Sequence, residues 1–437
     1  MKGRKAAAIT AAAVLAVFAV SCATLTFYKK VDNFVAAGDF AAAGEVIEKE
    51  KKQYKGNHEL LYYFDRGAVL QMAGEYSEST RMLNEAEYKI EDLFTKSVTQ
   101  EVGAFLSNDL NLPYAGEDFE QVMVHILKAL NFMYAGDFQG ARVESRKINH
   151  RLNMLTDRLE GKNIYQEDAF ARYLSAMIYE ALGERDAAYI DYRKAYEAYK
   201  HYQKLYGMAV PEAVRSDVLR LADAVRDTQR MARYRKEWGE VAYEKWADTG
   251  KKGEAVIIVY DGMAPYKSQY FFNAPIKDKD GKQVDLVRVA FPKFVPRGHR
   301  VETVTASSRG VDFSGFLAQD LNLIAVKNLE NKILLISAKA IARAIAKHQA
   351  KRAISGDGKN EGLGLLMSVY NIASEQADTR CWRTLPARFH ILRARLNPGK
   401  HELKVKVSLA GGGTAEKTLN VHIKPGRKEV MPVFMFN

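Results

Sequence analysis

The pattern of apolar and polar positions divides the chain into a helical part and a strand-rich part. Over residues 28–246 prolines are few, and apolar residues recur with the spacing of amphipathic helices. We interpret the polar run over residues 248–253 as a linker. In residues 254–437, short runs alternate between apolar and polar residues, which is typical of strands. The sequence therefore predicts an α+β fold, with N-terminal helical repeats and a β-rich, sandwich-like C-terminal domain.

The strand-rich part also contains one long helical signal. A helix is predicted at about 321–352, because Leu329, Ile333, Ile336 and Ala340 fall on one apolar stripe. Glycine and proline turns separate the strand candidates on either side of it. These candidates are residues 254–260, 288–291, 301–305, 388–396, 402–409, 416–423 and 429–436.

A short turn phrase recurs four times in the helical part. Its copies begin at Gly38, Gly74, Gly136 and Gly183, and a small residue stands five positions after each glycine. The pattern resembles the tetratricopeptide repeat (TPR), in which small residues let two antiparallel helices approach closely. Unrelated helix hairpins with glycine caps are the simpler alternative. The resemblance implies a TPR-like stack of helix pairs that binds other proteins. Residues 96–120 interrupt it, as a binding loop or an inserted turn.

The first residues predict a secreted lipoprotein. A basic start and an apolar run over residues 6–20 have the layout of a signal peptide, residues 1–21. The small residues before Cys22 resemble a lipobox, which implies a lipid on Cys22 and a lipidated N-terminus over residues 22–27. An ordinary signal peptide or an uncleaved anchor is the alternative. Ala23 in place of Asp favours the outer membrane, with the anchored chain facing the periplasm.

The charge and the cysteines restrict the partners. The net charge of +12 is spread along the chain, and in a secreted protein it favours anionic lipid, wall polymer or an acidic protein over nucleic acid. The second cysteine, Cys381, is left without a disulfide partner if Cys22 carries lipid.

Two groups of residues are candidates for partner binding. In the predicted helix, Lys339, Arg343, Lys347 and Lys351 recur every four residues and form a basic ridge. A solvated helix face is the more common explanation for such a ridge.

The second group lies in the most distinctive phrase of the chain, residues 377–387. It contains Asp378, Arg380, Trp382 and Arg383, and neighbouring Arg and Trp residues are frequent in interfaces. A turn clamped onto the following strand by an Asp–Arg pair is the alternative.

Searches for catalytic and ligand-binding motifs find none that fits. The chain lacks HExxH, paired zinc ligands, a calcium loop and a Gly-x-Ser-x-Gly elbow. The glycine-rich stretch over residues 355–364 has neither the spacing nor the Ser or Thr of a phosphate loop. We expect no enzyme activity, no metal and no cofactor.

Several phrases, in order along the mature chain, resemble an uncharacterised family of bacterial envelope lipoproteins with an N-terminal TPR-like region. The resemblance implies work at the cell envelope, because members are often encoded near lipoproteins that activate penicillin-binding proteins. It supplies no catalytic residues. The phrases lie at residues 114–120, 136–146, 261–267, 340–347 and 378–386.

The sequence therefore predicts a membrane-anchored scaffold or assembly factor that binds envelope proteins through its repeats. A module whose basic strand-rich half binds peptidoglycan is one alternative, and an envelope enzyme with an unfamiliar site is another.

Overall fold

The helices come first along the chain and are paired. The computed structural model describes residues 26–99, 109–158, 165–277, 283–355 and 376–436, so the predicted signal peptide and Cys22 lie outside the described residues. A helix over residues 26–36 precedes α2 (Phe40–Lys49). The helices that follow are α3 (Glu59–Met72), α4 (Tyr76–Thr99), α6 (Asp118–Tyr134), α7 (Phe138–Arg158), α8 (Ala169–Ala181), α9 (Arg185–Tyr206), α10 (Glu212–Ala224), α11 (Thr228–Trp238) and the short α12 (Trp246–Thr249).

The four predicted turn glycines each join two antiparallel helices. Gly38, Gly74, Gly136 and Gly183 all have φ between +74° and +84°, which L side chains rarely adopt. Close packing needs a further glycine, because a Cβ on Gly67 would lie 2.7 Å from the Leu83 side chain. Helix pairs joined and packed in this way confirm a TPR-like helical region.

The strands form one seven-stranded sheet and a separate hairpin. The order in the sheet is β8-β7-β4-β5-β6-β1-β9, and β1 pairs antiparallel with β6 and parallel with β9. The α+β prediction is therefore confirmed. The strands are β1 (Gly253–Met263), β2 (Tyr266–Lys277), β3 (Gln283–Val295), β4 (Val301–Ser308), β5 (Val311–Asp320), β6 (Pro386–Leu396), β7 (Gly399–Leu409), β8 (Thr414–Ile423) and β9 (Lys428–Met435).

The central strand β1 is buried along its whole length and serves two cores. Val256, Ile258 and Tyr260 belong to the core that the sheet shares with the helices. The residues between them, such as Ile257, pack in a second core with side chains of β4, β6, β7 and β8. This two-residue period follows from the alternation of side chains along a strand. The second core lies between parts of one continuous sheet, which explains the sandwich-like pattern of the sequence.

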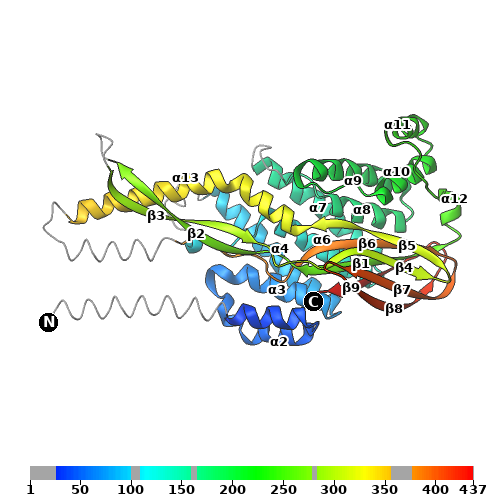
Figure 1. Cartoon of the computed structure of the whole chain (residues 1–437), viewed down its shortest axis with the longest axis horizontal. Coiled ribbons are helices and arrows are strands. Elements are labelled where there is room, and N and C mark those ends of the chain that lie inside the picture. Colours follow the sequence, from blue (N-terminus) through cyan, green and yellow to red (C-terminus); the bar gives the residue numbers. More distant parts are fainter. Residues whose placement is uncertain (1–25, 100–108, 159–164, 278–282, 356–375, 437) are drawn as a thin grey trace.

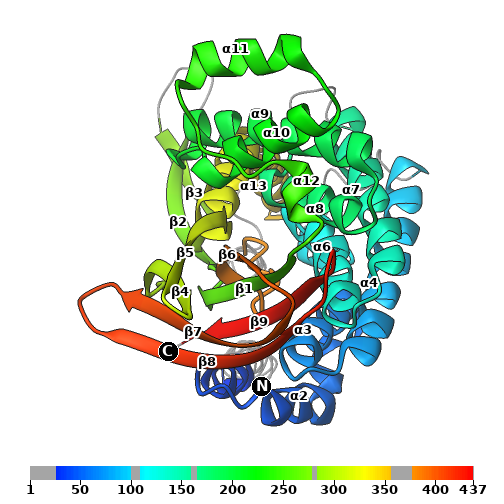
Figure 2. The same ribbon diagram turned by 90° about the vertical axis from the view of Figure 1, so that its right-hand side faces the viewer.

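The helical array curves along one side of the sheet, and β4, β7 and β8 lie on the side away from it (Figure 2). The first helix of each pair faces inward, and α6 and α8 are buried along almost their whole length. Tyr260 of β1 donates a hydrogen bond to Gln71 of α3 over 2.8 Å. Phe389 of β6 stacks on Phe170 of α8, with ring centroids 4.9 Å apart. The chain's own sheet therefore occupies the inner face of the array.

The hairpin and the long helix project together from the rest of the molecule (Figure 1). The hairpin is formed by β2 and β3, and α13 (Leu321–Ser355) packs along it through Ala340, which lies in a small apolar cluster with Val289 and Phe291. We call β2, β3 and α13 the arm. The helix was predicted from the sequence, whereas β2 was not. Among the described residues, no helix has both the length and the apolar character that crossing a bilayer requires.

Candidate functional site

Three of the distinctive sequence phrases meet at one place in the structure. Glu117 and Glu120 lie at the start of α6, Lys267 lies near the start of β2, and Arg380 and Trp382 lie in the segment before β6. We call these five residues the junction. It connects the helical array, the root of the arm and the sheet.

Glu117 holds the root of the arm to the helical array. Its carboxylate forms ion pairs with Lys267 of β2 and with Lys332 of α13, the second at 3.4 Å. Lys332 also lies 2.8 Å from Asp118. Burial raises the pKa of Glu117, but the two ammonium groups outweigh it and lower the pKa to about 2. Glu117 therefore stays ionised, and both parts of the arm depend on it.

Glu120 joins the helix start to the segment before β6. It accepts hydrogen bonds from the Trp382 backbone N–H at 2.7 Å, from the Tyr114 hydroxyl at 2.5 Å and from the Glu117 backbone N–H at 2.9 Å. The last of these bonds is half of a capping box. Burial, and then the nearby charge of Glu117, raise the pKa of Glu120 to about 7 although these donors oppose the shift.

Arg380 holds the segment before β6 against the helical array. Its guanidinium pairs with Asp378 through two contacts of 2.9 and 2.8 Å. It also donates to the backbone carbonyls of Asn57 and Leu112 at 3.0 and 2.9 Å. One arginine thereby joins three segments that are far apart in the sequence, and a bidentate pair of this kind fixes geometry as well as charge.

Trp382 is a core residue. It is 1% exposed and stacks on Phe64 of α3 with ring centroids 4.1 Å apart. Its indole N–H donates to Thr384, whose hydroxyl donates in turn to Asp65 over 2.9 Å. Beside it, Cys381 is buried, and burial raises the pKa of its thiol to about 12. A protonated, inaccessible thiol is not a nucleophile.

Arg383 lies next to the first turn of the helix over residues 26–36. It pairs with Asp32 at 2.7 Å, and its guanidinium lies 4.7 Å from the ring centroid of Tyr28 and 5.1 Å from that of Tyr266. Arg297 also pairs with Asp32, at 2.9 Å. The helix over residues 26–36 is thereby joined to the root of the arm.

The predicted residues Asp378, Arg380, Trp382 and Arg383 are thus brought together, and they contact other parts of the same chain. Their role in binding a partner remains a prediction. These contacts agree with the alternative interpretation, in which an Asp–Arg pair holds a turn against the following strand.

The described residues of the predicted basic ridge on α13 are less exposed than a solvent-facing ridge requires. Arg343 is 7% exposed and Lys339 is half-buried, whereas the side chains of Lys347 and Lys351 lie outside the described ones. At least one member of the ridge is therefore turned away from solvent, and its role in binding a partner also remains a prediction.

A second buried network joins the helices to the sheet. Arg393 of β6 contacts Asp217 of α10 at 2.7 Å, Glu254 of β1 at 2.8 Å and Glu180 of α8 at 3.0 Å. Burial lowers the pKa of Arg393, but the carboxylates outweigh it and raise that pKa well above its usual value. Charges buried this deeply are tolerated because each is paired.

A cluster of Glu87, His125 and Glu144 has the ligand types of a metal site. Their ligand atoms lie within 4.8 Å of one another. The ammonium of Lys128, however, lies 2.5 Å from Glu87 and 3.0 Å from Glu144. Lys147 pairs with the same two carboxylates, at 2.8 and 3.5 Å. Two internal cations already balance the two carboxylates, so these residues do not fit a metal ion.

A groove lies between α9 and α11 on the helical array. It has a volume of about 390 Å³. Arg193 and Lys194 of α9 and Arg233 of α11 line it, and none of these three cations forms an ion pair with a described residue. Lys200 pairs with both Glu197 and Glu237, the acidic residues of these helices that also line the groove, at 3.4 and 3.8 Å. Counted over the whole lining, four Lys or Arg side chains face Glu167, Glu197 and Glu237, so the groove has a small excess of positive charge.

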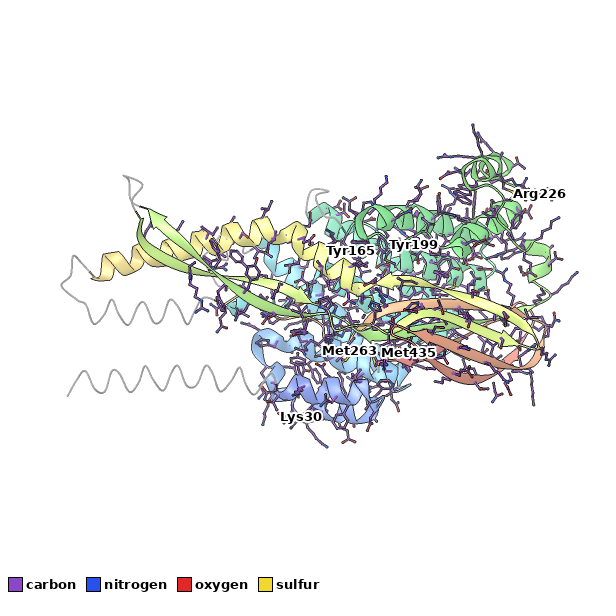
Figure 3. The ribbon with its side chains drawn as sticks, in the orientation of Figure 1. Lys30, Tyr165, Tyr199, Arg226, Met263 and Met435 are labelled. Carbon is purple, nitrogen blue, oxygen red and sulfur yellow. The ribbon has the colours of Figure 1, made fainter. Side chains whose placement is uncertain are left out.

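One wall of the groove, α11, is at the end of the molecule away from the arm (Figure 1). Arg226, in the turn before α11, is on the same side (Figure 3). The sequence analysis did not identify this groove, although α11 carries Arg230, Arg233, Arg235 and Lys236 within seven residues. That basic run is the signal that could have found it.

Comparisons with known proteins add little. Neither a family model nor a curated protein matches the chain. Solved structures of repeat proteins match about half of it. TPR-like repeats of a putative kinesin light chain from Podosopora anserina are 11% identical, with 48% of this chain and 91% of that chain covered and a TM-score of 0.30. MamA AMB-1 is 11% identical, with 50% of this chain and 90% of that chain covered and a TM-score of 0.28. BtubC from P. vanneervenii is 15% identical, with 54% of this chain and 93% of that chain covered and a TM-score of 0.32. Scores this low carry no argument, and the repeat assignment rests on the helix pairs themselves.

Proposed function

We propose that the chain is a lipid-anchored scaffold of the bacterial cell envelope, and that it binds an acidic segment of a partner protein in the α9–α11 groove. The proposal rests on one observation: one face of the helical array is covered by the sheet, whereas another face carries an open groove. The sheet fills the inner face, on which helical repeats often hold their ligands, while the α9–α11 groove stays open.

The charges of the groove indicate the chemistry of the partner. Arg193, Lys194 and Arg233 lack ion-pair partners among the described residues, so an acidic side chain placed between them would be bound by charge-assisted hydrogen bonds. Tyr234 adds an aromatic wall. A groove of about 390 Å³ accommodates a few side chains of a peptide segment rather than a large cofactor.

The geometry gives the scaffold two ends with different tasks. Cys22 is the predicted lipid attachment site, and the chain enters the described fold beside the root of the arm. The groove lies between α9 and α11, and α11 is at the end of the molecule away from the arm (Figure 1). A partner held there would be kept away from the anchoring membrane at a distance set by the length of the body.

The test is crosslinking in living cells, followed by tagged purification and mass spectrometry. We expect one envelope protein to be recovered with the wild type and lost with the groove variant Arg193→Glu/Arg233→Glu. The matched control is Lys404→Glu/Lys406→Glu, which reverses two exposed charges on β7. Cys22→Ala separates the need for the anchor from the need for the groove. Equal recovery with the groove variant and the wild type would contradict the proposal.

The peptidoglycan alternative is supported by one surface. Lys400, Lys404 and Lys406 alternate along β7 and are all exposed, so they lie on one face of the sheet. Glu402 and Glu416 pair with two of them, at 3.6 and 3.8 Å, which weakens this surface as a polyanion site. Sedimentation of the Lys404→Glu/Lys406→Glu variant with purified peptidoglycan tests this alternative: loss of binding by this variant alone would favour it.

A further inference from the structure

The arm exposes an unusual amount of apolar surface. Twelve large apolar side chains are exposed among the described residues, and eight of them belong to β2 or α13. Scattered exposed apolar residues are common, but a concentration on one projecting element marks a surface that binds something. The residues used in the argument below are Phe271, Phe272, Leu334, Leu335, Ile341 and Ile345.

Part of this surface is a continuous stripe. Leu334, Ile341 and Ile345 are spaced by seven and four residues, so they lie on one face of α13. Ala340, on another face of the helix, packs against the hairpin. Leu334 is 80% exposed, which no packing within the described chain accounts for.

The hairpin exposes aromatic residues at a similar distance from the root. Phe271 and Phe272 are 41% and 57% exposed. Phe271 is about 16 Å along β2 from Tyr266, and Leu334 is about 20 Å along α13 from Leu321. The Arg288 guanidinium lies 3.6 Å from the ring centroid of Phe271. An arginine on an aromatic ring is suited to the boundary between apolar and charged surroundings.

The charge of the arm favours an anionic occupant. Beyond Lys332, which pairs with Glu117 and Asp118, residues 333–355 contain five Lys or Arg residues and neither Asp nor Glu. Protein interfaces usually deplete lysine, whereas surfaces that bind anionic bilayers combine basic with aromatic and aliphatic side chains.

The predicted anchor places a bilayer within reach of the arm. Tyr28 and Tyr266, the latter at the root of the arm, both contact Arg383. Cys22 precedes Tyr28 by six residues, which span at most about 20 Å. Tyr28 and Tyr266 each lie about 5 Å from Arg383, so the membrane that holds the lipid lies within about 30 Å of the root. Ile345 is about 36 Å along α13 from Leu321, so the apolar part of the arm can cover this distance.

We propose that the arm binds the bilayer in which Cys22 is anchored, with its exposed apolar side chains in the interfacial region and its basic side chains near anionic headgroups. The inference rests on the lipid anchor of the proposed function. Such binding gives a second membrane contact and fixes the orientation of the body, so that the α9–α11 groove points away from the membrane. Binding of the arm to the bilayer does not require a partner in the groove.

The test uses the lipidated full chain in vesicles of phosphatidylethanolamine, with and without phosphatidylglycerol. An environment-sensitive dye is attached to Leu334→Cys or Phe272→Cys, and to the control Val143→Cys on α7, which is 52% exposed on the helical array. Cys381 is buried and does not compete for the dye. Lipids that carry a nitroxide quench dyes that reach the bilayer.

We expect blue-shifted emission and lipid quenching at both arm positions but not at Val143→Cys, and stronger quenching when phosphatidylglycerol is present. Adding Phe271→Ser/Ile341→Ser to the Leu334→Cys chain should lower the ratio of inserted to free arm at least about tenfold. Circular dichroism checks that each variant is folded.

The outcomes distinguish failure of the arm proposal from failure of the predicted lipid anchor on Cys22. Mass spectrometry of the N-terminal peptide reports acylation of Cys22. An acylated chain whose arm dyes remain in water overturns the arm proposal and leaves the anchor intact. A chain without the acyl group overturns both. Arm dyes that are shielded from water but not quenched by lipid, together with disulfide dimers of the unlabelled Leu334→Cys chain under oxidising conditions, overturn the arm proposal in favour of a second copy of this chain.

Discussion

Replacing Lys267 by Met tests whether the junction holds the arm to the helical array. The substitution keeps most of the side-chain volume and removes the ammonium that pairs with Glu117. The Glu117 side chain is only 15% exposed, so its charge is left mostly buried, with Lys332 at 3.4 Å as the remaining cation. Breaking one side of a buried pair costs about 3–5 kcal/mol.

The pKa of Glu117 gives a second measure of the same effect. It is about 2 in the folded chain, against an ordinary value of 4.5. At about 1.4 kcal/mol per pH unit, this difference contributes about 3.4 kcal/mol, shared between Lys267 and Lys332. We therefore expect Lys267→Met to lower the free energy of unfolding by about 2–4 kcal/mol near neutral pH.

The effect should depend on pH with a defined sign. A carboxyl group whose pKa is lowered by folding stabilises the fold above its unfolded pKa of 4.5, and this contribution is lost as the pH falls toward 2. The wild type and the variant should therefore begin to converge below about pH 4.5 and should meet near pH 2. Urea unfolding at several pH values measures this.

Two further variants complete the test. The double variant Glu117→Gln/Lys267→Met should recover much of the loss, because it removes both charges of the pair while Lys332 still pairs with Asp118 at 2.8 Å. The control Lys404→Met, at a side chain that is 66% exposed, should change the free energy of unfolding by less than about 0.5 kcal/mol. A Lys267→Met chain as stable as this control, or a deficit that does not change with pH, would refute the reasoning.

Three more outcomes are expected. Trp382→Ala should cost about 3–5 kcal/mol in urea unfolding, because a 1%-exposed indole leaves a cavity beside Phe64, whereas Tyr88→Ala at a 65%-exposed position should be nearly neutral. Arg393→Met should lower the free energy of unfolding by about 2–4 kcal/mol, since Glu180, Asp217 and Glu254 lose one of the cations that pair with them while Arg220, Arg395 and Lys428 remain; a change below about 1 kcal/mol would contradict the network. Cys381 should resist alkylation by iodoacetamide in the folded chain and react in urea, and rapid labelling without urea would contradict its burial.

The sequence predicted the elements that are controlled by local rules. The four turn glycines were identified because helix hairpins need a residue of positive φ, and the structure places all four in that conformation. The strand candidate at 254–260 lies within β1, where apolar residues serve two cores. The hairpin strand β2 was missed because its aromatic residues are consecutive and exposed. A strand that buries neither face gives no alternating pattern.

The junction could be predicted only in part. The phrase around Trp382 stands out by its composition, and the Asp378–Arg380 pair was among the alternatives considered. Its other partners could not be identified, because Glu117 and Glu120 precede it by more than 250 residues, and only the folded chain brings them together. The groove was missed for a different reason: the basic residues of α11 have the pattern of an ordinary solvated helix face.

The most direct test of the two-ended scaffold is site-specific photocrosslinking in living cells, with the crosslinker in place of Arg233 in the groove, Leu334 in the arm, or Val143 as a control. The account predicts adducts with one envelope protein from Arg233, adducts with lipid from Leu334 and neither from Val143. Protein adducts from Leu334 together with none from Arg233 would contradict it, because they would place the partner on the arm and leave the groove without a function.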